Sequence, residues 1–181
     1  MKIVDFGIGG ICVIEPDVIE DNRGLFFECF NESQFRKITG NDLSFVQENH
    51  SRSTGSVLRG LHYQLGRPQG KLVRVVAGAI FDVAVDIRRH SSTFRKWHAT
   101  TLSAENRRMV WIPPGFAHGF LAMSKAAECI YKTTEYWDKN SEHCIAWNDP
   151  ELAIAWPLKT TPILSDRDRS ARLLDEATVF E

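Results

Sequence analysis

The sequence predicts an all-β protein, a β-sandwich or jelly roll with a few short helices. Short segments rich in β-branched and aromatic residues follow one another closely, and Gly, Pro, Asn or Ser separates most of them. One segment, residues 81–87 (FDVAVDI), alternates strictly between apolar and other side chains, as strands do. Helix-capping signals occur at only two places. Many short strands with few helices are typical of two-sheet folds.

The predicted strands fill most of the chain up to Trp137. They are residues 2–19, 24–30, 55–65, 70–78, 79–87, 96–103, 108–115, 118–124 and 128–137. In FDVAVDI the apolar residues share one face, and the other face carries Asp82, Ala84 and Asp86. The GIGG at residues 7–10 lacks the full GxGxxG spacing of a nucleotide-binding loop and leads into a strand. We therefore interpret it as a bend or bulge.

Both predicted helices begin at a possible capping box. Asn31 with Gln34 precedes SQFRKITG, and Gly40 is suited to end that helix. Ser165 with Asp168 precedes a second candidate helix, SARLLDEA, near the C-terminus. The sequence has no internal repeat, linker or low-complexity segment, so we expect residues 1–181 to form a single domain.

Composition and charge exclude several classes of protein. The four cysteines are widely spaced without a CxxC pair, which argues against a zinc knuckle or redox motif and indicates core or near-core thiols. A formal net charge of −1 gives no general attraction for nucleic acid. Asp5 interrupts any signal-peptide core, and no run of ~20 apolar residues could span a membrane. We expect a soluble, cytoplasmic protein without nucleic-acid or membrane partners.

His62 lies in an apolar segment and could be a metal ligand or a base. An interior histidine in a jelly roll is typical of cupin barrels, and IPPGFAHGF with His118 resembles the second cupin motif. The first cupin motif has two histidines one residue apart, but Tyr63 and Gln64 follow His62. Two histidines are too few for a divalent ion, and the ammonium of Lys71 would repel it. The sequence thus favours a base without metal or cofactor.

As a base, His62 needs a carboxylate partner. A free imidazole has a pKa of about 6.5 and is largely unprotonated at neutral pH. A carboxylate that orients the ring and stabilises the imidazolium would strengthen it as a base. Asp82, Asp86 and Asp168 are candidates, and the residues alone do not choose among them.

Nine segments in chain order resemble the dTDP-4-dehydrorhamnose 3,5-epimerase family. They run from residue 21 to residue 168 and are DNRGLFFE, FVQENHS, LRGLHYQ, QGKLVRV, FDVAVDIR, WIPPGFAHGF, YKTTEYW, WNDP and LSDRD. The resemblance implies a cupin-type jelly roll, a homodimer and no metal. It also implies an isomerase that converts dTDP-4-dehydro-6-deoxy-α-D-glucose to dTDP-4-dehydro-β-L-rhamnose, in the making of dTDP-L-rhamnose for surface polysaccharides.

The reaction requires a base, an acid across the sugar ring and a cation at the enolate oxygen. The resemblance implies that His62 is the base, Asp168 its orienting carboxylate, Tyr131 the acid and Lys71 the cation. Asp168 could instead cap a helix. Tyr136 is a rival acid, but odd spacing in a strand would put it on the opposite face from Tyr131.

The resemblance also implies a set of substrate-binding residues. Arg23 and Arg59 would hold the diphosphate, and a bulge at Gly60 would let Arg59 face the same cavity as His62. Arg167 could add a third cation where the family more often has lysine. The remaining implied contacts to the nucleotide and sugar are Glu28, Gln47, Asn49, His118, Glu142 and Trp137, the last of which would stack on thymine.

Other functions compete with this prediction. A 3-epimerase, a 5-epimerase or a keto-isomerase of a dTDP-4-keto-6-deoxy sugar would use similar residues. A non-catalytic cupin that binds nucleotide sugars would lack the base or the acid, and this sequence has both. A metal-dependent dioxygenase would need a third His or carboxylate ligand, and none has the required spacing.

Overall fold

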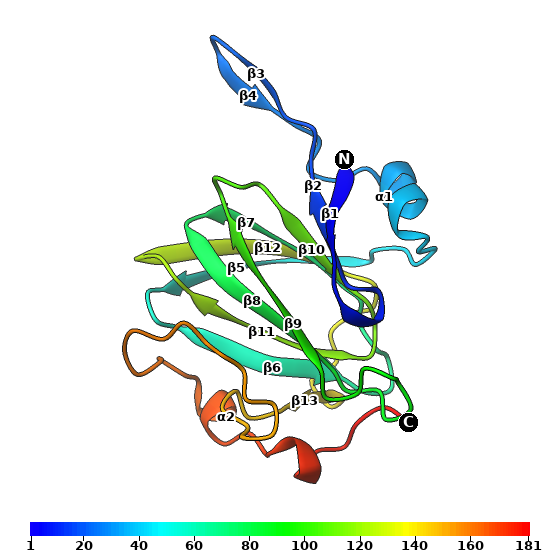
Figure 1. Ribbon diagram of the computed structural model, residues 1–181, viewed down its shortest axis with the longest axis vertical. Coiled ribbons are helices and arrows are strands. Elements are labelled where there is room, and N and C mark those ends of the chain that lie inside the picture. The colour runs from blue at the N-terminus through cyan, green and yellow to red at the C-terminus, as the bar shows by residue number, and fades with distance from the viewer.

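Two antiparallel sheets face each other in the computed structural model, which describes residues 1–181 (Figure 1). The six-stranded sheet has the order β1 (Lys2–Phe6), β2 (Cys12–Glu15), β10 (Met109–Ile112), β7 (Lys71–Ala77), β12 (Ala126–Thr133) and β5 (Gln47–Thr54). The five-stranded sheet has the order β13 (Glu142–Cys144), β6 (Leu58–Gln64), β11 (Phe116–Ala122), β8 (Ala79–Asp86) and β9 (Trp97–Ser103). The predicted all-β class is confirmed.

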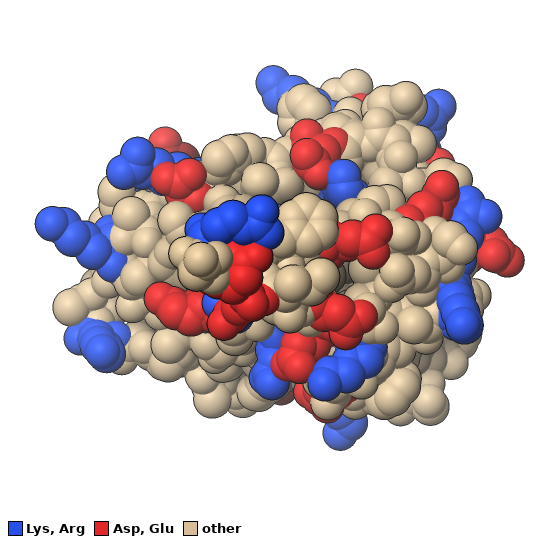
Figure 2. Space-filling view, turned by 90° about the horizontal axis from the view of Figure 1, so that it is seen from above, with Lys and Arg blue, Asp and Glu red and all other residues tan.

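A two-stranded hairpin, which we call the arm, projects from the body (Figure 1). It consists of β3 (Ile19–Asp21) and β4 (Gly24–Phe26). Its apolar side chains are unusually open to solvent, since Ile19 is 65% exposed and Phe26 67%. Figure 2 shows the molecule from the side of the arm, with acidic and basic side chains interspersed.

The predicted N-terminal strand is divided into β1 and β2 by a 3₁₀ turn at Ile8–Gly10. Gly9 and Gly10 have φ values of 57° and 94°, which glycine adopts readily and which turn the chain back on itself. β1 and β2 then pair as a hairpin. The interpretation of GIGG as a bend is therefore confirmed.

The first predicted helix is confirmed as α1 (Glu32–Thr39). The side chain of Asn31 accepts a hydrogen bond from the Gln34 N–H at 3.1 Å, and Gly40 ends the helix with φ 65°. Phe35 is buried on α1 and packs edge-on against Trp111 of the six-stranded sheet. α1 thereby covers part of the outer face of that sheet.

The second predicted helix is wrong in extent. Ser165 caps α2, but α2 covers only Asp166–Arg169, and SARLLDEA contains no more than a 3₁₀ turn at Leu174–Glu176. The backbone there bonds to other parts of the chain instead: Arg172 O accepts from Ala146 N, and Leu174 N donates to the side chain of Asp149. Neither α1 nor α2 is long and apolar enough to cross a membrane.

β8, the strand that contains the alternating FDVAVDI segment, is buried on both faces. Ala84 belongs to the apolar core between the sheets, whereas Val83 and Val85 pack beneath the C-terminal segment, against Leu174 among others. The polar face of FDVAVDI is thus the interior face, and Asp82 is only 2% exposed there. Of the cysteines, Cys29 contradicts the prediction of near-core thiols, because it is exposed at the base of the arm.

Candidate active site

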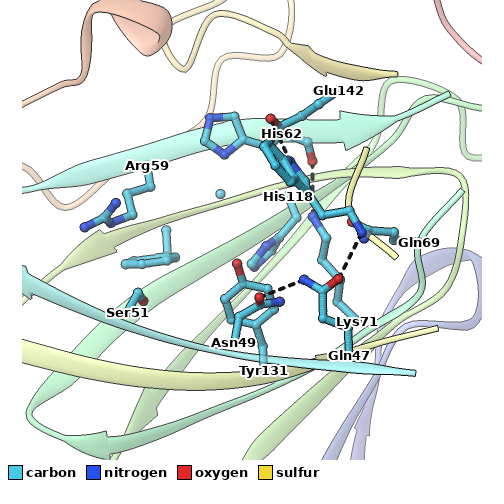
Figure 3. A pocket seen from close by; sticks show the side chains of 13 residues that line it. Gln47, Asn49, Ser51, Arg59, His62, Gln69, Lys71, His118, Tyr131 and Glu142 are labelled. Atoms are coloured by element: carbon cyan, nitrogen blue, oxygen red, sulfur yellow. Dashed lines mark hydrogen bonds between the residues drawn. The ribbon is translucent and has the colours of Figure 1, made fainter. Parts of the chain in front are cut away.

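A polar cavity of about 340 Å³ opens between the two sheets (Figure 3). Its volume is in the range of small-molecule sites. Only three of its 13 lining residues are hydrophobic. The lining residues are Gln47, Asn49, Ser51, Arg59, His62, Gln69, Lys71, His118, Gly119, Phe120, Tyr131, Trp137 and Glu142. Nine of these were predicted as site residues, which shows that the two sheets bring most of the predicted set together.

His62 is hydrogen-bonded to Asp168, the carboxylate that the family resemblance implied as its partner. The distance between His62 Nε2 and Asp168 Oδ1 is 2.5 Å, and Asp168 is 4% exposed. Burial alone would raise the pKa of the Asp168 carboxyl, but hydrogen bonds from His62 and Ser165 outweigh it and lower the pKa overall. Asp168 therefore stays ionised and can orient the imidazole.

The two roles considered for Asp168 do not conflict, because different atoms perform them. The backbone N–H of Asp168 donates to Ser165 Oγ at 3.1 Å, which is the helix cap. The hydroxyl of Ser165 donates to Asp168 Oδ2 at 2.7 Å, and Oδ1 is left for His62. The helix start thus holds the carboxylate in place.

The other two candidate carboxylates have different partners. Asp82 Oδ2 lies 2.8 Å from Nε2 of His118, so a second imidazole–carboxylate pair lies beside the cavity. Asp86 accepts hydrogen bonds from Arg88, Ser91 and Thr93. Neither bonds to His62, and the choice that the sequence left open falls on Asp168.

The predicted bulge at Gly60 is confirmed. His118 pairs with His62 across β11 and β6, but Phe120 pairs with Arg59, so β6 holds one extra residue between the two pairs. Gly60 has φ 114°, and a Cβ atom there would lie 2.6 Å from the Cα of Gly119. Only glycine fits, and the bulge lets Arg59 and His62 both line the cavity.

The facing sheet supplies Tyr131 and Lys71. They lie on the neighbouring strands β12 and β7 and line the cavity opposite His62 on β6 (Figure 3). Burial raises the pKa of Tyr131, so its phenol keeps a proton. As predicted, Lys71 shares an interior face with Val73 and Val75. Tyr136 lies outside the strands and is 58% exposed.

Lys71 brings an almost fully buried ammonium group to the cavity. It is 9% exposed, and burial lowers its pKa to about 8, although the charges of Glu142 and Asp82 oppose the shift. Its Nζ lies 3.5 Å from the backbone oxygen of His62. A weakly solvated cation of this kind is well suited to stabilise negative charge that develops on a bound ligand.

Hydrogen bonds tie together the residues at one end of the cavity. Gln47 Nε2 donates to Asn49 Oδ1 at 2.8 Å, and Gln47 Oε1 accepts from the backbone of Trp137 at 3.0 Å. Glu142 accepts from the indole of Trp137 and forms an ion pair with Arg167. Arg167 does not line the cavity itself, and it reaches the site only through Glu142.

Arg23 and Glu28, two predicted binding residues, lie away from this cavity within the chain. Arg23 is on the arm, where its side chain is 86% exposed and pairs with Asp21 at 2.6 Å. Glu28 accepts hydrogen bonds from Asn31 and Gln34 beside α1. Sequence spacing could not show this separation, because the residues join no strand of the two main sheets.

The sequence-based prediction missed four lining residues, Ser51, Gln69, Gly119 and Phe120. Two had a signal. Ser51 is two residues beyond Asn49 in the same strand, and Phe120 two beyond His118, so period-2 alternation would have put them on the cavity face.

Cys144 lies close to His62 and Asp168, a proximity that the sequence pattern did not indicate. With His62 and Asp168 it forms a group whose ligand atoms all lie within 4.8 Å of one another. Burial raises the pKa of the Cys144 thiol to about 12, however, and metals bind the thiolate. The thiol instead donates a weak hydrogen bond to Asp168 Oδ1 at 3.6 Å.

The two-sheet fold with its cavity is shared with the cupin-like epimerases, a class of isomerases. The model of one family, dTDP-4-dehydrorhamnose 3,5-epimerase, matches residues 5–176. A relative of that name from Pseudomonas aeruginosa is 52% identical over 180 residues, which are 99% of each chain. The chain therefore belongs to the dTDP-4-dehydrorhamnose 3,5-epimerase family, as its motifs predicted.

Solved structures agree with this assignment. The dTDP-6-deoxy-D-glucose-3,5-epimerase from Legionella pneumophila, in complex with dTDP-4-keto-L-rhamnose, is 48% identical with a TM-score of 0.94, over 96% of this chain and 93% of that one. A 3′-monoepimerase from Streptomyces bikiniensis, in complex with dTDP-quinovose, is 35% identical with a TM-score of 0.89, over 97% and 88%. The fold is thus shared by epimerases that differ in the number of carbons they invert.

Proposed function

We propose that the protein converts dTDP-4-dehydro-6-deoxy-α-D-glucose to dTDP-4-dehydro-β-L-rhamnose without a cofactor, as a step in dTDP-L-rhamnose biosynthesis. The observation that carries the proposal is that the two facing sheets bring different catalytic groups to opposite sides of the cavity. His62 lies on one sheet, with the carboxylate of Asp168 from α2 bonded to it, and Tyr131 and Lys71 lie on the other sheet. Inversion at carbon needs a proton removed from one face and returned to the other, so base and acid must lie on opposite sides of the sugar.

The proposed reaction begins when His62 takes the proton from C3. The electrons of the broken C–H bond form the C3–C4 double bond of an enolate, and negative charge moves to the C4 oxygen, where Lys71 stabilises it. Tyr131 then gives its phenolic proton to the opposite face of C3, and the ketone re-forms. Solvent takes the proton from His62 and returns one to Tyr131. The same steps at C5 complete the double epimerisation.

Binding would use the groups around this centre. Arg59 has a guanidinium fork suited to the diphosphate, and it is held by Ser53 Oγ at 3.0 Å. Trp137 would stack on thymine, with Gln47, Asn49, His118 and Glu142 as polar contacts. Arg167 would act through its ion pair with Glu142.

We further propose that the protein works as a homodimer in the cytoplasm. An arm with exposed Ile19, Leu25 and Phe26 is suited to pack on a second copy of the chain. In such a dimer, Arg23 and Glu28 would approach the partner's cavity, which would reconcile their predicted role with their distance from the cavity of their own chain. The four unpaired cysteines are consistent with a reducing compartment.

Isotope exchange tests the proposal. The protein is incubated with the 4-dehydro sugar nucleotide in heavy water, with a chelator present, and C3 and C5 are followed by proton NMR and mass spectrometry. We expect deuterium at both carbons, and its loss with His62→Ala. Exchange at one carbon alone would identify a single-site epimerase, the alternative function. No exchange, or exchange that the chelator abolishes, would contradict the proposed chemistry.

A further inference from the structure

Trp137 lies outside every strand, and yet two hydrogen bonds hold it. β12 ends at Thr133, and Trp137 follows in a loop with 53% of its surface exposed. Its backbone N–H donates to Gln47 Oε1 at 3.0 Å, and its indole N–H donates to Glu142 Oε2 at 3.0 Å. An exposed tryptophan on a loop would otherwise have considerable conformational freedom, so these bonds order the indole at the cavity before any ligand arrives.

One buried side chain binds the peptide groups on both sides of Trp137. Gln64 is 3% exposed, and its Nε2 donates to Tyr136 O at 3.1 Å and to Arg67 O at 2.7 Å. Its Oε1 accepts from the Asp138 N–H at 2.8 Å. The side-chain amide of Gln64 therefore makes all of these hydrogen bonds to the backbone of two loops. Gln64 does not line the cavity, so it would touch no ligand there.

The same strand carries Gln64 and His62. Gln64 is the last residue of β6 and lies two positions beyond His62, on the same face of the strand. Its cross-strand partner on β13 is Glu142, which binds the indole of Trp137. One edge of the five-stranded sheet thus fixes both the backbone and the ring of Trp137 relative to His62.

We infer that Gln64 is a positioning residue that sets the affinity of the site for the planar base of a nucleoside diphosphate, by holding Trp137 as a preorganised stacking surface. The inference rests on the proposed function, since it assumes a nucleotide sugar as the substrate. Stacking of a base on an aromatic side chain is worth roughly five- to a hundredfold in affinity. Much of that gain is lost when the aromatic ring must first be ordered.

Calorimetric titration with two ligands, dTDP and inorganic pyrophosphate, tests the inference. We expect Gln64→Leu to weaken dTDP binding about tenfold and pyrophosphate binding less than about twofold, because only dTDP has a base to stack. In a Trp137→Ala background, Gln64→Leu should change dTDP affinity by less than about twofold. With the sugar nucleotide, KM should rise while kcat changes little. Binding of dTDP requires no turnover, so this result is independent of the proposed reaction.

Two results would overturn the inference. Equal loss of affinity for dTDP and pyrophosphate would mean that Gln64 supports the fold in general. If Gln64→Leu weakened dTDP binding as much in the Trp137→Ala background as in the wild type, Gln64 would not act through Trp137. Gln64→Glu is the second variant if Gln64→Leu does not fold, as judged by circular dichroism. It keeps the acceptor for Asp138 N–H but loses the donors to Tyr136 and Arg67, and the same selective loss of dTDP affinity is expected.

Discussion

The cavity and the arm hold their predicted binding residues in different ways. Arg59, His62 and Lys71 come from strands of two facing sheets, and strand register brings them into one cavity within a single chain. Arg23 lies on a hairpin that joins neither sheet, and its side chain is 86% exposed. The difference indicates that the fold of one chain assembles the chemical groups of the cavity. In the proposed dimer, the arm would act on the cavity of a second copy.

This comparison makes two kinds of prediction. Changes in the cavity should lower kcat in the subunit that carries them, since they remove groups that act in the transition state. Changes in the arm should raise KM and should act on the partner subunit. The predictions below run from the largest expected effect to the smallest.

His62→Ala should have the largest effect. Loss of the base should lower kcat by about 10³-fold or more, because general base catalysis supplies up to about 10⁴-fold. Steady-state assays of sugar epimerisation measure it. His50→Ala is the matched control, because His50 is a half-exposed histidine outside the cavity that pairs with Glu128. Comparable losses in both variants would show that the cavity is not the site of reaction.

Lys71→Met should lower kcat by about 10²-fold, as expected for one group that stabilises the enolate oxygen, and should stabilise the fold. The pKa of Lys71 falls from 10.5 to about 8 on folding, so the unfolded chain binds more protons between those values. Wild-type stability should therefore rise with pH from about 8 to 10.5, while activity falls as the ammonium is lost.

Denaturant titration at several pH values measures the stability of Lys71→Met. At pH 7 the gain over the wild type should be about 2–3 kcal/mol, since the penalty for burying the charge disappears. The gain in free energy of unfolding should shrink as pH rises from about 8 to 10.5. A variant that is less stable than the wild type at pH 7 would mean that the ammonium is better compensated in its site than its burial implies.

Arg23→Ala should raise KM about tenfold, as loss of one charge-assisted contact to a phosphate would. Mixed dimers with His62→Ala give the sharper test. In a mixed dimer, the Arg23→Ala subunit has an intact cavity and receives the intact arm of the His62→Ala subunit, so one of its two sites is complete. About half of the dimers formed from an equal mixture are mixed, so the mixture should recover about a quarter of wild-type activity at low substrate concentration. No recovery in dimers of verified composition would mean that the arm does not act across the dimer.

Ser165→Ala should have the smallest effect. Loss of the helix cap should lower the free energy of unfolding by about 1 kcal/mol. Loss of the second hydrogen bond to Asp168 should reduce kcat a few-fold, because the carboxylate is less firmly held but remains bonded to His62. Thermal unfolding and initial rates measure the two effects. An unchanged kcat would show that His62 alone is enough to position Asp168.

Strand patterns predicted the cavity residues on the two sheets. They did not predict the contacts that segments outside the sheets make. Period-2 alternation put Lys71 on the face of Val73, and Gly60 indicated the bulge beside His62, because both depend on local backbone geometry. Asp168 could not be singled out by spacing, since it reaches His62 from a segment 106 residues away. SARLLDEA was mistaken for a helix for the same reason, because distant partners such as Ala146 bind its backbone.

The central claim is that base and acid lie on opposite sides of the cavity, and Tyr131→Phe tests it most directly. The measurement compares deuterium exchange with inversion at C3 and C5 of the sugar by proton NMR. Because His62 remains, exchange should continue at a measurable rate while inversion falls by about 10²-fold or more. Inversion that keeps its wild-type rate would contradict the account, and so would exchange and inversion that fall by the same factor.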